Sequence, residues 1–461
     1  GVRPAAGDLA GGAGTDIAVT ANPGIQIITD PDLSEAPVTR LLGTEPGESI
    51  LVDPYFSTWC NPLVTGDVNN DFQPDLVVGC SRRHNYAVSG LKTNAGALFV
   101  FLGPLPAGNT DIVMANAAVG IWGAETDDHL GLVADLGDWN GDGQLDLIVG
   151  APDADDTGTG GVDNGRAMVF LLDPDQLPMF PQTWNLADGD TPDLDIVGGA
   201  GERLGWSVAM ADTNGDGEHE IAVGVLNGSP GGIAGAGAVY VAPDGPSSSW
   251  SVIDTTTHTD RFAAFHGTFA GGQLGTRVRL VDVDDDGTAD LAFSASQAQG
   301  GGSTADAGKL YVNLNKALQA PGTFTTVSDG VLDLTVTGEI ASGKLGAEML
   351  LADLNGDRRA EILAGGPFGD NGLIPGAGRV LALEADQPAA VLDLATAGDR
   401  LMADILGGDD SGQFGRHMAA GDVDGDGIND ILATAPLAGT STNGKAYVFL
   451  TPAADSDHDG T

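Results

Sequence analysis

A nine-residue acidic pattern that recurs along the chain constrains the fold more than any other feature. It has an acid at position one, Asp or Asn at three, Asp at five, an acid at nine, and then an apolar run. Six full copies begin at residues 67, 138, 212, 282, 353 and 422, and a degenerate copy begins at residue 8. Neighbouring copies begin 59 to 74 residues apart, so the chain is a repeat protein with a unit of about 70 residues.

The residues around each acidic segment repeat as well and have the pattern of short β-strands. One apolar strand precedes the segment, as at 204–208, and another follows it, as at 147–150. A glycine-rich stretch, a third strand such as 167–172, and a more variable fourth strand such as 332–338 complete the unit. Four strands in one repeat are typical of a propeller blade. The sequence therefore predicts an all-β fold, a seven-bladed β-propeller with about four antiparallel strands per blade.

The predicted propeller takes up nearly the whole chain. We expect it to span residues 1–452, with 453–461 as a tail that resembles the start of another calcium-binding repeat and so a truncated linker. The pattern provides only three strands for the last repeat, which leaves open how that blade is completed.

The strands on either side of the acidic segments resemble the FG-GAP repeats of integrin α-subunit propellers. The FG part is matched by Leu204-Gly205, Leu274-Gly275, Leu345-Gly346 and Phe414-Gly415, and the GAP part by Gly150-Ala151-Pro152. The resemblance implies a seven-bladed propeller with calcium loops in several blades, often with an extracellular adhesion or recognition role. Nothing in the sequence resembles the further integrin ectodomains, a membrane span or an inserted ligand-binding domain, so it implies an integrin-like propeller and not an integrin.

The acidic segments are predicted to be calcium loops. Calcium takes six to eight oxygen ligands, and the side chains at positions one, three, five and nine can converge on one ion, with the backbone carbonyl of position seven added. Position twelve falls inside an apolar strand, which excludes an EF-hand. The predicted metal ligands, loop by loop, are Asp67, Asn69, Asp71, Gln73 and Asp75; Asp138, Asn140, Asp142, Gln144 and Asp146; Asp212, Asn214, Asp216, Glu218 and Glu220; Asp282, Asp284, Asp286, Thr288 and Asp290; Asp353, Asn355, Asp357, Arg359 and Glu361; and Asp422, Asp424, Asp426, Ile428 and Asp430.

Position six of each loop should favour glycine, because the sharp turn there calls for a positive φ. Four loops have it, as Gly143, Gly217, Gly287 and Gly427. The other two have Phe72 and Arg358, so we expect those loops to be the most distorted. The degenerate copy from Asp8 to Asp16 keeps only the first and last acids, which leaves about six calcium sites.

The charge of the chain supports cation binding. Asp and Glu number 65 against 19 Lys and Arg, a net charge of −46, and 20 of the acids stand at positions one, three, five and nine of the predicted loops. Three or four carboxylates packed without a cation would repel one another or take up protons. Six calcium ions would reduce the charge to −34, and we expect their role to be structural. The remaining charge argues against nucleic acid as a partner.

Two cysteines, Cys60 and Cys80, flank the second acidic loop. Aligned on the repeat, they take the places of the FG glycine and the GAP alanine, which lie across one hairpin. A disulfide is predicted, with two buried thiols as the alternative, and it would fit an oxidising compartment.

The sequence does not decide whether the chain is an enzyme, but it favours a non-enzymatic role. Its seven histidines are scattered, and no nucleophile elbow or zinc-ligand spacing appears. The leading hypothesis is a secreted or cell-surface propeller for recognition or adhesion. It would bind a protein or glycan through loops opposite the calcium sites, where the basic segment 82–86 lies. Direct membrane insertion is not expected, since no run of 18 apolar residues occurs, and we expect a monomeric propeller within a longer chain.

The alternative is a carbohydrate-active propeller, either a lectin or a polysaccharide lyase. Aromatic and polar pockets repeated in several blades would favour a lectin. One pocket with convergent Arg, Tyr and His would favour a lyase.

Overall fold

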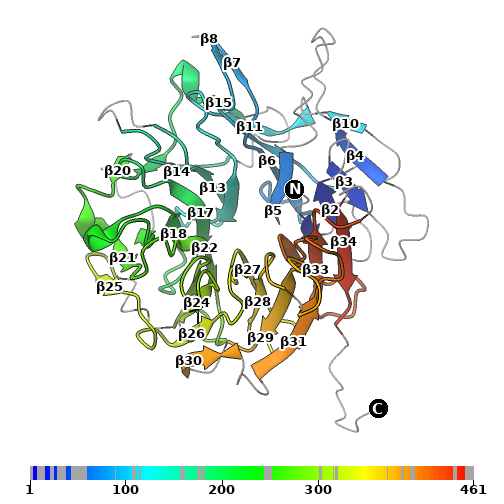
Figure 1. Cartoon of the computed structure of the whole chain (residues 1–461). Coiled ribbons are helices and arrows are strands. Elements are labelled where there is room, and N and C mark those ends of the chain that lie inside the picture. The colour runs from blue at the N-terminus through cyan, green and yellow to red at the C-terminus, as the bar shows by residue number, and fades with distance from the viewer. Residues whose placement is uncertain are drawn as a thin grey trace.

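The structure, a computed structural model, describes residues 4–7, 16–20, 25–28 and 38–42 and, with short gaps, residues 60–451. The predicted tail at 453–461 and most of the degenerate loop from Asp8 to Asp16 lie outside the described residues. The described chain forms small twisted sheets arranged around a central axis, as Figure 1 shows. The all-β propeller predicted from the repeat is confirmed.

The sheets follow one another in chain order. From the innermost strand of each sheet outward, they are β1 (Pro4–Gly7), β2 (Asp16–Thr20), β3 (Ile25–Ile28), β4 (Val38–Leu42) and β10 (Asp111–Val113); β5 (Cys60–Gly66), β6 (Asp75–Cys80), β9 (Ala97–Phe101), β11 (Val119–Trp122) and β15 (Gln182–Asn185); β12 (Val133–Gly137), β13 (Asp146–Ala151), β14 (Arg166–Phe170), β16 (Leu194–Val197) and β20 (Val252–Asp254); β17 (Leu204–Ala211), β18 (Glu220–Val225), β19 (Ala238–Ala242), β21 (Ala263–His266) and β25 (Phe324–Thr326); β22 (Leu274–Val281), β23 (Asp290–Ala295), β24 (Lys309–Asn313), β26 (Leu334–Thr337) and β30 (Ala389–Asp393); β27 (Glu348–Ala352), β28 (Glu361–Gly365), β29 (Arg379–Leu383) and β31 (Leu401–Leu406); and β32 (Met418–Gly421), β33 (Asp430–Ala435) and β34 (Lys445–Phe449).

Smaller elements lie in the connections between the strands of this ring. A two-stranded hairpin, β7 (Asn85–Ala87) and β8 (Gly90–Lys92), lies outside the sheets. Short 3-10 turns are η2 (Leu186–Asp188), η3 (Pro230–Gly232) and η4 (Thr259–Arg261). In the part of the chain that the structure describes, no helix has the length and apolar character needed to cross a membrane.

The outermost strand of each five-stranded sheet pairs in parallel, unlike the four antiparallel strands inside it. These strands are β10, β15, β20, β25 and β30, and they pair with β4, β11, β16, β21 and β26. Each comes from the connection between the third and fourth strands of the following repeat. Every repeat of this kind therefore covers the exposed edge of the sheet before it, which protects that edge from pairing with another chain.

The expectation of seven blades with about four strands each is wrong for the last sheet. Among the described residues, six sheets have four or five strands and so form full blades, whereas β32, β33 and β34 make a sheet of three. In the described chain the last sheet lacks a fourth strand, in agreement with the three-strand pattern of the last repeat. A repeat supplies both its own fourth strand and the outermost strand of the preceding sheet after its third strand. In the last repeat those positions follow Thr451, outside the described residues.

The hydrophobic core lies between neighbouring sheets. The second strand of a sheet is buried along its length, as in β6, β13 and β18. A strand buried on both faces needs a continuous apolar sequence, which explains the runs seen after each acidic segment. One cluster joins Val312 and Val336 of one sheet to Ile362 and Leu381 of the next.

The FG and GAP glycines meet where two sheets approach most closely. Gly205 has a φ of +81°, and a Cβ there would lie 2.1 Å from the carbonyl oxygen of Arg166. A Cβ on Gly150 of the preceding sheet would lie 2.2 Å from the carbonyl oxygen of Gly205. Glycine is therefore needed on both sides of this contact, because any side chain would force the sheets apart.

Cys60 and Cys80 form a disulfide. They are directly opposite partners in the pairing of β5 with β6, and their Cα atoms lie 4.0 Å apart. The disulfide predicted from their places in the repeat is confirmed.

Candidate metal loops

The six full acidic loops lie at one end of the sheets. Each joins the innermost strand of a sheet to the second strand, as 138–146 joins β12 to β13. The acid at position nine is the first residue of the second strand, for example Asp146. The loops therefore sit within β-hairpins, and position twelve lies in the second strand of each, as the exclusion of an EF-hand assumed.

The same three hydrogen bonds shape all six loops. In 138–146, the backbone N–H of Gly143 donates to Asp138 Oδ2 over 2.7 Å, and that of Gln144 donates to Asp142 Oδ1 over 2.9 Å. The N–H of Trp139 donates to Asp146 Oδ2 over 3.1 Å. The equivalent bonds occur in the other five loops. The chain thus wraps tightly around the acidic side chains in every copy.

The distortion expected at Phe72 and Arg358 is not found. Phe72 has a φ of +65° and Arg358 a φ of +74°, so both take the left-handed conformation of the glycines. Their N–H groups donate to Asp67 and Asp353 over 2.8 and 2.9 Å. The turn is kept at a conformational cost of about 1–2 kcal/mol for each side chain.

Carboxylates converge most closely in the two loops that have Asp at position three. Oxygen atoms of Asp282, Asp284 and Asp290 lie within 4.8 Å of one another. Those of Asp422, Asp424 and Asp426 do the same. In the other four loops position three is Asn, which contributes an amide oxygen in place of a charged one.

The donor set fits a hard cation such as calcium. Asp284 Oδ1 is buried and has no hydrogen-bond partner among the described residues, although it lies inside this carboxylate cluster. Burial raises the pKa of Asp146 to about 7, and the charges of Asp142 and Asp138 add to the effect. Burial likewise raises the pKa of Glu361 to about 7. A cation bound among these oxygens would stabilise the ionised form that burial and repulsion disfavour.

One loop already has a cationic side chain against it, which could not be predicted from the sequence. Lys316 Nζ lies 2.6 Å from the carbonyl oxygen of Ala289 and 2.5 Å from Asp290 Oδ1. It also lies 3.4 Å from the carbonyl oxygen of Thr288, the predicted backbone ligand at position seven. Lys316 follows β24 in the variable part of the repeat, so no spacing signal pointed to it.

Two segments of the chain match a known family of repeats. Residues 204–242 and 414–449 match the model of the FG-GAP repeat. The chain is 28% identical over 263 residues to Integrin alpha pat-2 of Caenorhabditis briggsae, which covers 54% of this chain and 19% of the relative. It is 26% identical over 203 residues to Integrin alpha-V of Gallus gallus, which covers 43% and 17%.

A second group of relatives consists of enzymes. The chain is 28% identical over 170 residues to the Phosphatidylinositol-glycan-specific phospholipase D of Bos taurus, which covers 37% of this chain and 19% of the relative. The match spans about a fifth of the length of the relatives. The resemblance to the FG-GAP repeats of integrin-like propellers is confirmed.

Proposed function

We propose that this chain is a calcium-stabilised propeller for recognition or adhesion in a secreted or cell-surface protein. It binds a protein or glycan ligand through the loops at the end opposite the acidic loops. The calcium ions occupy the six acidic loops and fix the hairpin that begins each repeat. The three-stranded sheet serves as the seventh blade of the ring, since β1 contacts both β32 and β5.

The observation that carries this proposal is the exposure of apolar side chains at that end. Tyr86 is 70% exposed, Val88 95% and Leu91 52%, and all three belong to the β7–β8 hairpin or its turn. Leu373, 92% exposed, lies in the equivalent connection of another repeat, between β28 and β29. Apolar side chains exposed on the loops at one end are typical of a binding surface.

The hairpin is held in place while its apolar side chains face solvent. Asn85 Nδ2 donates to Asn185 Oδ1 over 2.8 Å, and the N–H of Val88 donates to Asp188 Oδ1 over 2.8 Å. Figure 1 shows the hairpin projecting at the edge of the ring. A preorganised surface loses less conformational entropy when a partner binds.

Two observations support the secreted or cell-surface location. The Cys60–Cys80 disulfide fits an oxidising compartment. Calcium-binding modules outside the cell tolerate weak sites, because the sites work at the millimolar calcium of that environment. The similarity to integrin α-subunits agrees with this location.

The calcium part is tested by thermal unfolding with a chelator. We expect removal of calcium to lower Tm by about 10 °C or more, because ions that bind only the folded chain stabilise it by mass action. Adding calcium back in excess should restore Tm, and an equal concentration of magnesium should restore it less. An unchanged Tm would contradict a structural role for calcium.

The ligand part is tested on a glycan array and on intact cells. A double variant, Tyr86→Ser with Val88→Ser, should bind at least tenfold more weakly than the wild type. The matched control is Phe324→Ser, since Phe324 is 57% exposed on the outer strand β25, away from that end. Equal binding by the double variant would refute the proposed face. Turnover of an acidic polysaccharide would favour the lyase alternative instead.

A further inference from the structure

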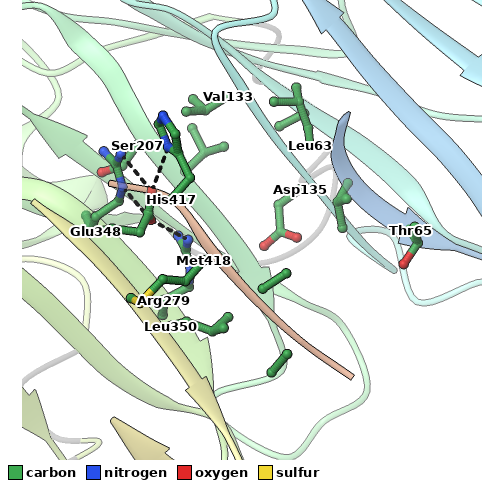
Figure 2. Close-up of a pocket in the computed structure, with 16 residues that line it drawn as sticks. Leu63, Thr65, Val133, Asp135, Ser207, Arg279, Glu348, Leu350, His417 and Met418 are labelled. Carbon is green, nitrogen blue, oxygen red and sulfur yellow. Dashed lines mark hydrogen bonds and ion pairs between the residues drawn. The ribbon is translucent and has the colours of Figure 1, made fainter. Parts of the chain in front are cut away.

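A cavity of about 300 Å³ lies on the axis of the ring, lined by the innermost strands of six successive sheets. These strands are β5, β12, β17, β22, β27 and β32. Figure 2 shows that polar side chains gather on one wall of the cavity, where Arg279, Glu348 and His417 lie together. The opposite wall includes Leu63 and Val133. The cavity is thus polar on one side and largely apolar on the other.

The charged residues occupy equivalent positions in successive repeats. Arg277, Glu348 and His417 each stand five residues before the first Asp of their loop. Asp135 and Arg279 each stand three residues before it. Because side chains alternate along a strand, positions five and three before the loop face the same side, here the axis. The charges therefore form two adjacent layers inside the channel.

Glu348 is the centre of the first layer. Its carboxylate accepts hydrogen bonds from Arg277 Nε over 2.8 Å and from Arg277 Nη2 over 3.2 Å. His417 Nδ1 lies 3.3 Å from Glu348 Oε2. Burial alone would raise the pKa of Glu348. The charge of Arg277 and the hydrogen bond from His417 outweigh it and hold this pKa well below its ordinary value. Glu348 is thus an ionised carboxylate fully engaged by its neighbours.

Arg279, in the second layer, is much less engaged. Its Nη1 donates to the carbonyl oxygen of Val278 over 2.8 Å, and its Nη2 lies 3.6 Å from Glu348 Oε1, too far for a good hydrogen bond. A guanidinium has five N–H donors in a planar fork that matches a carboxylate. The side chain of Arg279 is 30% exposed, against 13% for Arg277. Arg279 can therefore receive an anion that enters the cavity.

Asp135 provides an acceptor on the other side of the cavity. Its carboxylate accepts hydrogen bonds from the N–H of Met210 over 3.1 Å and from its own neighbour Leu136 over 3.0 Å. A carboxylate has about four acceptor positions, so Asp135 keeps capacity for a hydroxyl donor. A simple anion would be repelled by Asp135. An anion that also has hydroxyl groups could pair with Arg279 and donate a hydrogen bond to Asp135.

We propose that this channel binds a small hydroxylated carboxylic acid, the size of one sugar acid such as glucuronate. Its carboxylate pairs with the fork of Arg279, and a hydroxyl group donates to Asp135. The apolar wall at Leu63 and Val133 contacts the carbon skeleton. A cavity of about 300 Å³ is at the small end of ligand sites, which favours one ring over a chain of several.

This site is separate from the loop surface proposed above, and it is a binding site rather than a lyase centre. The cavity has convergent Arg and His, but its described lining includes no Tyr. His417 is also occupied by Glu348, which makes it a poor candidate for a general base. The polysaccharide lyase hypothesis therefore gains no support from this cavity.

The test is calorimetric titration of the calcium-loaded chain with glucuronate, glucose and acetate. We expect glucuronate to bind at least tenfold more tightly than glucose, which lacks the carboxylate, and than acetate, which lacks the hydroxyls. Arg279→Leu should weaken glucuronate binding at least tenfold, and Arg279→Lys should weaken it severalfold. The matched control is Arg261→Leu, since Arg261 lies in η4 outside the channel and should leave binding unchanged.

Asp135→Asn tests the acceptor on the other side of the cavity. The amide keeps an acceptor oxygen and removes a negative charge, so glucuronate should bind severalfold more tightly than to the wild type at pH 7. No glucuronate binding by the wild type, equal binding by a folded Arg279→Leu variant, or equal binding of glucose would each overturn the proposal.

Discussion

The acidic loops and the central channel are both built from residues that repeat in position, but only the loops repeat in chemistry. Position one of every full loop is Asp, and the same hydrogen bonds shape all six. In the channel, the position five residues before the loop is Val133, Ser207, Arg277, Glu348 or His417, according to the repeat.

This difference distinguishes residues that stabilise the fold of every repeat from residues that determine what the protein binds. A feature present in every repeat serves what every repeat needs, which is a fixed hairpin at the start of a sheet. A feature present once serves a task that the molecule performs once. The loops also bring carboxylates together with few basic side chains beside them, whereas in the channel Arg277, Arg279 and His417 surround a single ionised carboxylate, Glu348. Variants of each region can test whether the two are as independent as they look.

The largest effect is expected from Glu348→Gln in the channel. It leaves Arg277 and Arg279 without their shared counter-charge, and breaking a buried pair in this way costs about 3–5 kcal/mol of unfolding free energy. Urea unfolding with calcium in excess measures it. The control is Glu339→Gln, because Glu339 is 35% exposed and its partner Arg379 also pairs with Asp404. We expect the control to cost less than about 1 kcal/mol. A loss below that value in Glu348→Gln would mean that the channel charges are not coupled.

A smaller effect is expected from the pH dependence of Asp135. Burial raises its pKa from 3.8 to about 6, so the folded chain holds a proton that the unfolded chain releases. The unfolding free energy should therefore fall as the pH rises from about 4 to about 6, by at most about 3 kcal/mol, and stay low above that. Asp135→Asn should remove this part of the dependence. Parallel curves for the wild type and the variant, both with calcium in excess, would show that Asp135 titrates normally.

A third prediction concerns loop 282–290, which Lys316 contacts. In Lys316→Met the ammonium no longer competes for Asp290 and the carbonyl oxygen of Thr288, so we expect calcium to bind loop 282–290 about tenfold more tightly. Calcium titration by calorimetry measures the change. The control is Lys445→Met, whose ammonium pairs with Asp409. If Lys316→Met binds calcium more weakly, then the ammonium supports the ligands and does not compete with the ion.

The smallest effect is expected at position six of the loops. Phe72→Gly should raise the unfolding free energy by about 1 kcal/mol, because glycine takes the φ of +65° without strain. Gly143→Ala, at the same position of the next loop with a φ of +83°, should lower it by a similar amount. Opposite signs in the two variants would confirm that these two loops share one turn. A loss of stability in Phe72→Gly would show that the phenyl ring makes a compensating contact.

The repeat allowed the fold and the loops to be predicted, and its limits explain what was missed. Side chains that recur at a fixed spacing, such as those of 138–146, indicate a shared local structure. The Cys60–Cys80 pairing followed from the same alignment. Lys316, Arg279 and Asp135 could not be found in this way, because each occurs in one repeat only. Their partners come from other strands and other sheets, which no spacing along the chain reveals.

The parallel outer strands were missed for a related reason. The prediction treated each sheet as the product of one repeat, whereas the outer strands β10, β15, β20, β25 and β30 each belong to the repeat that follows. A five-stranded sheet is complete only when the next repeat has passed its third strand. Sequence similarity between repeats is weakest in this connecting segment. The pairing of each outer strand with the preceding sheet therefore could not be recognised from the sequence.

The parallel outer strands also determine how the ring would carry a mechanical load. Each is covalently part of one repeat and hydrogen-bonded to the sheet before it. A force that pulls two neighbouring sheets apart is therefore resisted by backbone hydrogen bonds in addition to side-chain packing. Within the described residues, β31 is the one outer edge of a full blade without such a strand, next to the three-stranded sheet. Under tension, a junction closed by such a strand should therefore hold longer than one held by side-chain packing alone.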